Sequence, residues 1–264
     1  MKKLFLATTA LVAMAAGSAS AADMAVKARP LPPPPPACAQ FGGFWLGANV
    51  GWAKYDHQWS DRDGWAGIVD NDLVGDRRNT KGGFAGGIGG GYNWQTGCTV
   101  FGVSIDYNWA SINAANTYTD GEGVLTDTLT VASKLRAYGT AMARTGLVVD
   151  NLLLYVTGGL AYARFNREWT LFDDGNGVTE VFSQNRGRWG GVIGVGTEWS
   201  FAPNWSIKSE FLYMAFERDE VSFISPVHNP GFTHRFESQD SMWVSRIGLN
   251  YRFGGYGGPV VAKY

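Results

Sequence analysis

The sequence has no long apolar run after its first residues. A transmembrane helix needs about 18 or more consecutive apolar residues. The longest later candidate, LLLYVTGGLAYA at 152–163, is shorter and is bounded by Asp150-Asn151 and Arg164. The absence argues against a bundle of transmembrane helices in the processed chain.

Charge of either sign is also scarce. Asp, Glu, Lys and Arg make up 17% of the chain and leave a formal net charge of −1, whereas about 25% of residues are charged in an average soluble domain. A nucleic-acid-binding protein would show a basic patch or stripe. We therefore expect no nucleic-acid partner.

Residues suited to catalysis or metal binding are few. The three histidines, His57, His228 and His234, lie near predicted loops, and their spacing matches no common metal site. Asp56 and His57 form the only adjacent acid–histidine pair, and no serine stands in a matching position. We expect no enzyme, no catalytic residue, no metal site and no cofactor.

The N-terminus has the order of parts of a secretory signal peptide. Two lysines precede an apolar run over residues 4–16, and a small-residue ASA site ends at Ala21. We predict a signal peptide at 1–21, cut between Ala21 and Ala22. The segment 22–40 holds most of the ten prolines and is predicted to be an extended arm in the periplasm.

What the sequence has in abundance is alternation. In VFGVSIDYNWA, at 100–110, large apolar residues alternate with Gly, Ser, Asp and Asn. A period of two is typical of a β-strand with one apolar and one polar face. The same pattern recurs in eight segments, near 41–58, 81–94, 99–111, 132–148, 152–165, 188–201, 205–216 and 241–253.

The links between these segments are short and long in turn. Short links occur near 95–98, 149–151 and 202–204, and long polar links are expected at 59–80, 112–131, 166–187 and 217–240. Tight turns on one side and long loops on the other are typical of an outer-membrane barrel. The long links are acidic, and their DRDG and DDGNG sequences are interpreted as turns because neither has EF-hand spacing.

The residues that alternate with the apolar side chains are small. In GGFAGGIGGGYNW, Phe84, Ile88 and Tyr92 share one face while glycines occupy the other. An eight-stranded barrel has an interior only just wide enough for side chains, so the large apolar face must point outward to lipid. Many Trp and Tyr residues lie toward segment ends, where interfacial girdles form.

The few large polar residues on the small-residue face should then meet inside the barrel. Buried charges are tolerated only when they are paired. The predicted interior network consists of Asp106, Arg136, Arg144, Glu198, Lys208, Glu210, Arg246 and Arg252. It is interpreted as a salt-bridged plug, with an ion-selecting constriction as the alternative.

The two cysteines both fall at the short-turn end. Cys38 precedes the first strand and Cys98 lies in the turn between the second and third. The periplasm permits disulfides, so we predict a Cys38–Cys98 bond that ties the arm to the barrel, with two free thiols as the alternative.

Read together, the segments resemble the small outer-membrane immunogenic or opacity-type porins of alphaproteobacteria, relatives of the OmpA-like eight-stranded barrel. The resemblance covers nearly the whole chain and lies in the order of GFWLGANVGW, GGFAGGIGGGYNW, VFGVSIDYNW, LLLYVTGGLAYA, GVIGVGTEW and VSRIGLNYRF. It implies a monomer that is inserted by the barrel-assembly machinery and exposes antigenic loops. Such barrels end on an assembly signal, which matches Ile247, Leu249, Tyr251 and Phe253.

The predicted fold is therefore an all-β, transmembrane, antiparallel up-and-down β-barrel of eight strands over 41–253. Residues 254–264 form a tail or the end of the last strand. The chain is expected in the outer membrane of a Gram-negative bacterium, in contact with its lipids and lipopolysaccharide. The expected role is structural and surface-interacting, in envelope stability and as a surface antigen. A narrow porin is the first alternative, and a haem or metal-binding surface receptor is the second.

Overall fold

The computed structural model describes residues 38–62, 76–119, 128–174, 177–224, 231 and 233–253. The chain divides into two units, 1–36 and 37–264. The predicted signal peptide, its cleavage between Ala21 and Ala22, the arm as far as residue 37 and the segment 254–264 lie outside the described residues. No helix among the described residues is long and apolar enough to cross a membrane.

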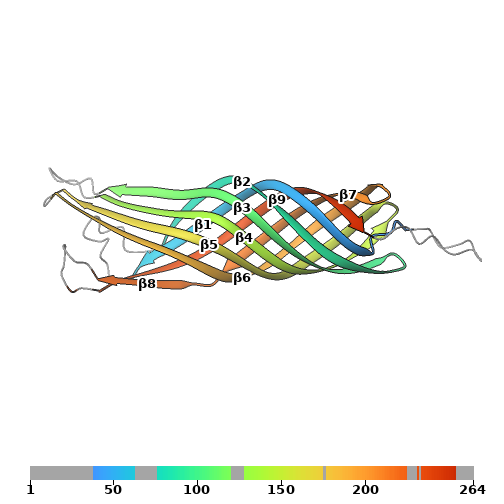
Figure 1. Ribbon diagram of the computed structural model, residues 1–264. Coiled ribbons are helices and arrows are strands. Elements are labelled where there is room, and N and C mark those ends of the chain that lie inside the picture. The colour runs from blue at the N-terminus through green and yellow to red at the C-terminus, as the bar shows by residue number, and fades with distance from the viewer. Residues whose placement is uncertain are drawn as a thin grey trace, which may run out of the picture. The chain divides into compact units, whose positions relative to one another are not determined.

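The second unit is an antiparallel sheet closed on itself (Figure 1). Neighbours along the chain pair with one another, and β1 pairs β9 to complete the ring. The strands are β1 (Gly43–Asp61), β2 (Asp76–Thr96), β3 (Thr99–Thr119), β4 (Thr128–Val149), β5 (Leu152–Asp173), β6 (Val178–Ala202), β7 (Trp205–Phe216), β8 (Asp219–Ile224) and β9 (Thr233–Phe253).

Strands β7 and β8 together occupy one position in this ring. β7 pairs β9 from Trp205 to Ala215, and β8 continues along the same edge of β9 from Asp219 to Ile224. The chain is interrupted only at residues 217–218. The predicted eight-stranded barrel is confirmed, with its seventh strand in two pieces.

Tight turns join β2 to β3, β4 to β5 and β6 to β7 at one end of the barrel, which we call the turn end. Gly97 and Asp150 have positive φ, of 59° and 53°. Glycine adopts this conformation freely, and aspartate is one of the few other residues that do so. The opposite end is called the loop end.

The strands run much further toward the loop end than the sequence pattern predicts. Most of 112–131 and 166–187, expected as polar loops, belongs to β3, β4, β5 and β6. In these extensions many inward positions remain apolar, as at Trp59, Trp169 and Phe236, while most outward positions become polar. The prediction was wrong here because a strand that leaves the lipid keeps its inward alternation and loses its apolar outer face.

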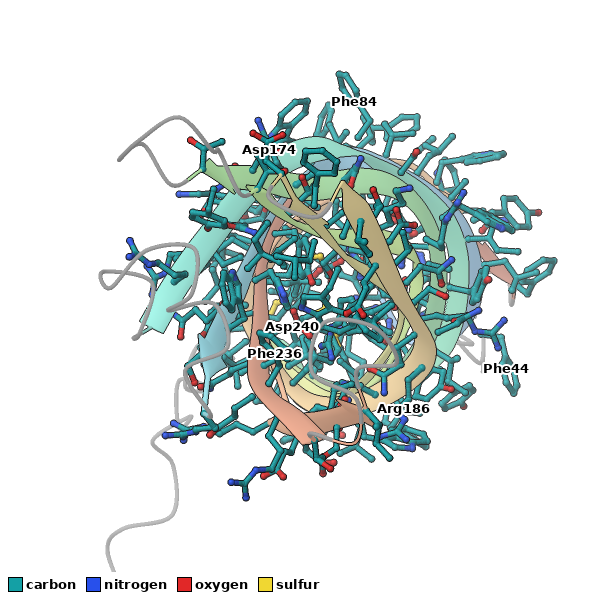
Figure 2. The ribbon with its side chains drawn as sticks, turned by 90° about the vertical axis from the view of Figure 1, so that its left-hand side faces the viewer. Phe44, Phe84, Asp174, Arg186, Phe236 and Asp240 are labelled. Atoms are coloured by element: carbon teal, nitrogen blue, oxygen red, sulfur yellow. A yellow bond between two sulfur atoms is a disulfide. The ribbon has the colours of Figure 1, made fainter. Side chains whose placement is uncertain are left out.

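The apolar face points outward, as predicted. Phe44, Phe84 and Ile105 are 65%, 78% and 71% exposed, and Figure 2 shows Phe44 and Phe84 directed away from the ring. The inward face is crowded instead: a Cβ on Gly89 would lie 2.3 Å from a carboxylate oxygen of Asp106. Glycine is therefore required where neighbouring strands carry large inward side chains.

Exposed aromatic rings border this apolar band at both ends. The inner aromatic row, near the turn end, comprises Trp94, Phe101, Trp199, Trp205 and Phe253. The outer aromatic row, toward the loop end, comprises Trp52, Trp109, Tyr162, Trp189 and Trp243. Such girdles mark the two membrane interfaces of a barrel, so the strand extensions beyond the outer aromatic row lie outside the hydrocarbon.

Candidate functional site

The interior of the barrel is a stack of layers, and the lowest closes the turn end. Phe41 is fully buried among Val100, Val148 and Leu153. Its backbone N–H donates to Gln95 at 2.6 Å, and its carbonyl accepts from Asn93 at 2.7 Å. Cys38 and Cys98 form a disulfide beside this layer. The segment that precedes β1 is thereby attached to the turn end of the barrel by hydrogen bonds and a disulfide. We call this lowest layer the floor.

Above the floor lies the first group of buried charges. Arg144 donates to Glu198 at 3.0 Å, and the same carboxylate accepts from Ser206 and Asn250 at 2.6 and 3.1 Å. Arg252 donates to Ser200 at 3.0 Å and to a backbone carbonyl of the floor. Glu198 thereby offsets the buried charge of Arg144, and Arg252 is held by two oxygen acceptors.

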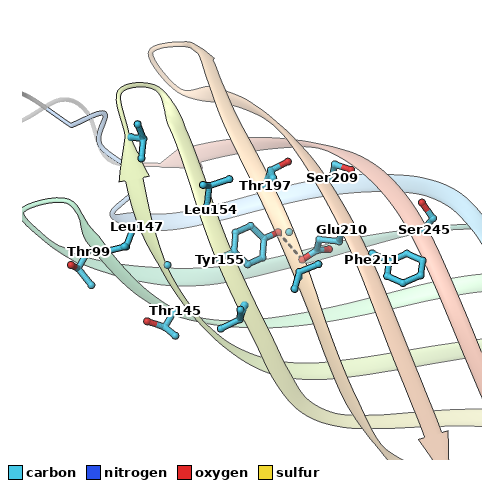
Figure 3. Close-up of a pocket in the computed structure, with 15 residues that line it drawn as sticks. Thr99, Thr145, Leu147, Leu154, Tyr155, Thr197, Ser209, Glu210, Phe211 and Ser245 are labelled. Atoms are coloured by element: carbon cyan, nitrogen blue, oxygen red, sulfur yellow. Dashed lines mark hydrogen bonds between the residues drawn. The ribbon is translucent and has the colours of Figure 1, made fainter.

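A second group follows at mid-barrel. Glu210 accepts from Arg246 at 2.7 Å and from Tyr155 at 2.8 Å, and Lys208 lies 3.3 Å from the same carboxylate. Asp106 lies 3.4 Å from Arg246. Figure 3 shows the Tyr155–Glu210 hydrogen bond beneath the barrel wall. The two groups bring together seven of the eight residues predicted for the interior.

Arg136 is the exception, because it lies on the outer surface. Opposite β5, Leu135 pairs Phe165 and Ala137 pairs Arg164, so Arg136 has no opposite residue and forms a β-bulge. A bulge shifts the alternation by one position. Even-numbered residues of β4 face inward on the turn side of Arg136, and odd-numbered ones on the loop side.

An apolar layer, which we call the septum, fills the barrel on the loop side of these charges, at the level of the outer aromatic row and just beyond it. Each of the eight strand positions contributes to it, and its largest members are buried to within 3% exposure. The septum includes Tyr55, Ala85, Ile112, Leu135, Tyr138, Phe165, Val192, Leu212, Met214, Phe216, Met242 and Val244. Since these side chains come from every strand position and form one contacting cluster, they fill the lumen at this level with apolar side chains.

Beyond the septum lies an outer ion cluster that the sequence analysis missed. Asp240 accepts from Tyr55 at 2.6 Å, lies 2.8 Å from His57 and pairs with Arg167. Arg167 also lies 3.3 Å from Asp219. Figure 2 shows Asp240 pointing into the ring. The sequence held one indication of this cluster. Asp240 stands two residues before Met242, and therefore on the same inward face of β9.

The electrostatics of Asp240 follow from this setting. Burial alone would raise the pKa of the carboxyl group, but the charge of Arg167 and the hydrogen bonds from His57 and Tyr55 outweigh it. The pKa of Asp240 therefore lies well below its usual range. The residue is ionised at any physiological pH.

A second apolar cluster, the cap, closes the loop end above these ions. It is built from Trp59, Leu129, Val131, Trp169, Leu171, Val221 and Phe236. His57 and Asp240 are both 0% exposed beneath it. A histidine–aspartate pair is thus present, but it is sealed between the septum and the cap, away from any substrate.

The large cavities lie on the outside of the barrel. One of about 740 Å³ is lined by Thr145, Val156, Val195 and Thr197 (Figure 3). Another of about 700 Å³ is lined by Leu46, Gly90, Val103 and Ala141. Most of their lining side chains face the apolar band, so these hollows open to hydrocarbon.

The remaining predicted residues fall as follows. Ile247, Leu249, Tyr251 and Phe253 share the outward face at the end of β9, which ends at Phe253. His228 and the side chain of His234 lie outside the described residues. Within the described residues no group of three His, Cys, Asp or Glu side chains is placed to hold a metal ion.

Known proteins share this pattern. Residues 9–253 match the outer membrane protein beta-barrel domain family. The 31 kDa outer-membrane immunogenic protein of Brucella melitensis is 32% identical over 96% of this chain and 100% of its own length. Outer membrane protein P5 of Haemophilus influenzae is 24% identical over 86% of this chain and 58% of its own length. OprG of Pseudomonas aeruginosa, a solved structure, has a TM-score of 0.48 at 15% identity, covering 82% of this chain and 99% of that one.

Proposed function

The chain belongs to the outer membrane protein beta-barrel domain family, and on that premise we propose that it is a closed barrel that holds a binding surface outside the cell. Family and relatives make it an outer-membrane surface protein of a Gram-negative bacterium. The loop end is then extracellular and the turn end periplasmic. We call the strand extensions beyond the outer aromatic row the extracellular head.

The septum is the observation that carries the proposal. A porin needs a continuous polar path, whereas here apolar side chains from every strand position meet in one buried cluster. Most of the charged groups beneath it are held in ion pairs with one another, as in Arg144–Glu198 and Arg246–Glu210. The narrow porin is therefore the less favoured function.

Planar-bilayer conductance of the refolded mature protein tests the proposal. We expect no defined current steps from the wild type, and none from an Arg144→Ala, Arg246→Ala variant, because the septum closes the lumen separately. A Phe165→Ala, Leu212→Ala variant, which thins the septum, should open it. Defined current steps from the wild type would contradict the proposal and show that the protein is a porin.

Catalysis and haem or metal binding are not part of the proposal. The buried His57–Asp240 pair lacks access to a substrate, and the names of the relatives describe outer-membrane proteins. We further propose contact with lipopolysaccharide around the extracellular head, insertion by the barrel-assembly machinery and a monomeric state. Titration with haem, compared between the wild type and a His228→Ala, His234→Ala variant, checks the receptor alternative.

A further inference from the structure

The closed ring ends at the outer aromatic row. Pairing between β2 and β3 stops at Ala85 opposite Ala110, although both strands continue for about ten residues. Pairing between β6 and β7 stops at Gly190 opposite Phe216. The extracellular head is therefore two separate sheets, β3–β4–β5–β6 and β2–β1–β9–β8, which face each other across the cap (Figure 2).

The two seams between these sheets are held differently. The seam between β6 and β8 is joined by charge: Asp219 lies 3.2 Å from Arg186, pairs with Arg188, and lies 3.3 Å from Arg167. These ion pairs cross from one sheet to the other in place of backbone hydrogen bonds. This seam is closed.

The seam between β2 and β3 is bridged mainly by neutral side chains, and Arg77 of β2 lies 6.0 Å from the centre of the Tyr118 ring of β3. The Oδ1 atom of Asn79 accepts from Asn116 and from Tyr118, each at 2.8 Å. Across the described residues 76–84 and 111–119, no backbone pair joins the two strands. Two strand edges thus run side by side without a ladder, and alternate residues on each present N–H and C=O groups to the gap.

The position of the seam makes it available to a partner. It begins where Trp109 and Phe84 mark the outer membrane interface, and it rises from there into the extracellular head. Thr80, Lys81, Ser111 and other seam residues are exposed. In soluble proteins such unpaired edges are covered or are used to add a further strand.

The charges around the seam indicate which kind of segment would bind there. The β2 side carries Arg77, Arg78 and Lys81, with Asp76 as its one acid, whereas residues 111–119 of β3 carry no charge. Arg136, exposed at the bulge of the neighbouring strand, adds a further cation. An extended segment that paired with these edges would be favoured if its own side chains were acidic.

We propose that the β2–β3 seam binds an acidic, extended peptide segment of another protein by β-strand addition. Backbone hydrogen bonds from 76–84 and 111–119 provide the attachment, and Arg78 and Lys81 provide the preference for acidic residues. The inference rests on the proposed surface-binding role and names the kind of partner for it.

The test uses a ten-residue probe peptide of alternating Val and Glu and the full mature protein refolded in lipid nanodiscs. We expect the labelled peptide to bind in fluorescence anisotropy and to slow backbone amide exchange in 76–84 and 111–119. A copy that is N-methylated at alternate residues cannot complete a ladder and should not bind. Equal binding by the methylated peptide, or binding that leaves exchange at both edges unchanged, would overturn the proposal.

A matched pair of charge reversals tests the selectivity. Lys81→Glu at the seam should weaken binding about fivefold, because an attraction between exposed charges becomes a repulsion. Arg218→Glu, at an exposed cation beside β8 on the far edge of the sheet, should leave binding unchanged. Equal losses would show general charge attraction and contradict a site at the seam.

Amide exchange of the protein without peptide tests whether another segment already occupies the β2–β3 seam. Among 111–119, the amides that pair with β4 are protected in any case. Slow exchange of the alternate amides that face the seam, before any peptide is added, would mean that the seam is already filled, by residues 63–75 of the same chain if the protein is monomeric or by a second copy if it is dimeric. Either result overturns the proposal. The closed barrel is judged separately by its conductance, so the two ideas can fail independently.

Discussion

Asp240 shows how much one buried carboxylate can organise. It joins β9 to Tyr55 and His57 on β1 and to Arg167 on β5, and so links the two sheets of the extracellular head from within. Removing one partner of a buried ion pair leaves the others charged and uncompensated, which typically costs about 3–5 kcal/mol. The same residue controls how the head responds to acid.

Asp240→Asn should destabilise the extracellular head by up to about 3–5 kcal/mol, because Arg167 loses one of its two buried counter-charges and keeps only Asp219. Amide exchange of 128–135 and 165–171 in the refolded protein measures the loss. Glu237→Gln is the control: Glu237 pairs with the exposed Arg62 and Arg218, and exposed pairs contribute little. Equal effects of the two variants would contradict the role assigned to the outer ion cluster.

The stability of the head should depend on pH through Asp240. Its pKa is lowered in the folded protein, so the unfolded state takes up the proton first as the pH falls, and the stabilisation is lost below the ordinary aspartate value of about 3.9. Amide protection of the head should be constant from pH 7 to about pH 5 and then decline. In Asp240→Asn the decline should be reduced; an unchanged acid profile would assign it to another group.

At the scale of elements, the β4 bulge corrects the placement of Arg136 that strand periodicity predicts. The Cys38–Cys98 disulfide adds a covalent link that periodicity does not describe. Strict alternation places Arg136 inside, but the bulge turns it out and brings Leu135, Ser133 and Val131 inward. Period-two reasoning is reliable only within an uninterrupted strand, because one extra residue exchanges the faces beyond it.

Deleting Arg136 should disrupt β4 on the loop side far more than Arg136→Ala does. The deletion removes the bulge and would turn Leu135 outward, whereas the substitution only trims an exposed side chain, which costs within about 0.5 kcal/mol. Amide exchange of 128–135 distinguishes the two variants. Comparable protection in both would mean that the bulge does not set the register.

Loss of the disulfide should lower the free energy of unfolding. The bond joins residues 60 apart in sequence, and the chain-entropy relation gives up to about 4 kcal/mol for a loop of this length. Urea unfolding of Cys38→Ser, Cys98→Ser in lipid, beside the oxidised and reduced wild type, measures it. The reduced wild type should match the double variant; a difference between them would point to an effect of the serines themselves.

At the scale of the whole barrel, the membrane ring and the extracellular head differ in how they are closed. The ring has backbone pairing at every seam, while the head is held at two seams by side chains alone. A region with fewer backbone pairs is expected to open at a lower free energy.

The head should therefore open before the ring as urea is raised. Exchange of amides in 128–135 should become fast at urea concentrations that leave 139–147 of the same strand protected. The comparison within β4 cancels differences between strands. Simultaneous loss of protection in both stretches would show that the head and the ring unfold as one cooperative unit, which would contradict this prediction.

The sequence by itself determined the barrel, the outward direction of its apolar face and the meeting of most interior charges. These follow from local rules: a period of two, small residues opposite large apolar ones, and the alternation of tight turns with long links. Only the tertiary structure decided the septum, the outer ion cluster and the β2–β3 seam. Each depends on which residues of distant strands lie at the same height, and strand register is set by pairing and bulges that a single segment does not reveal.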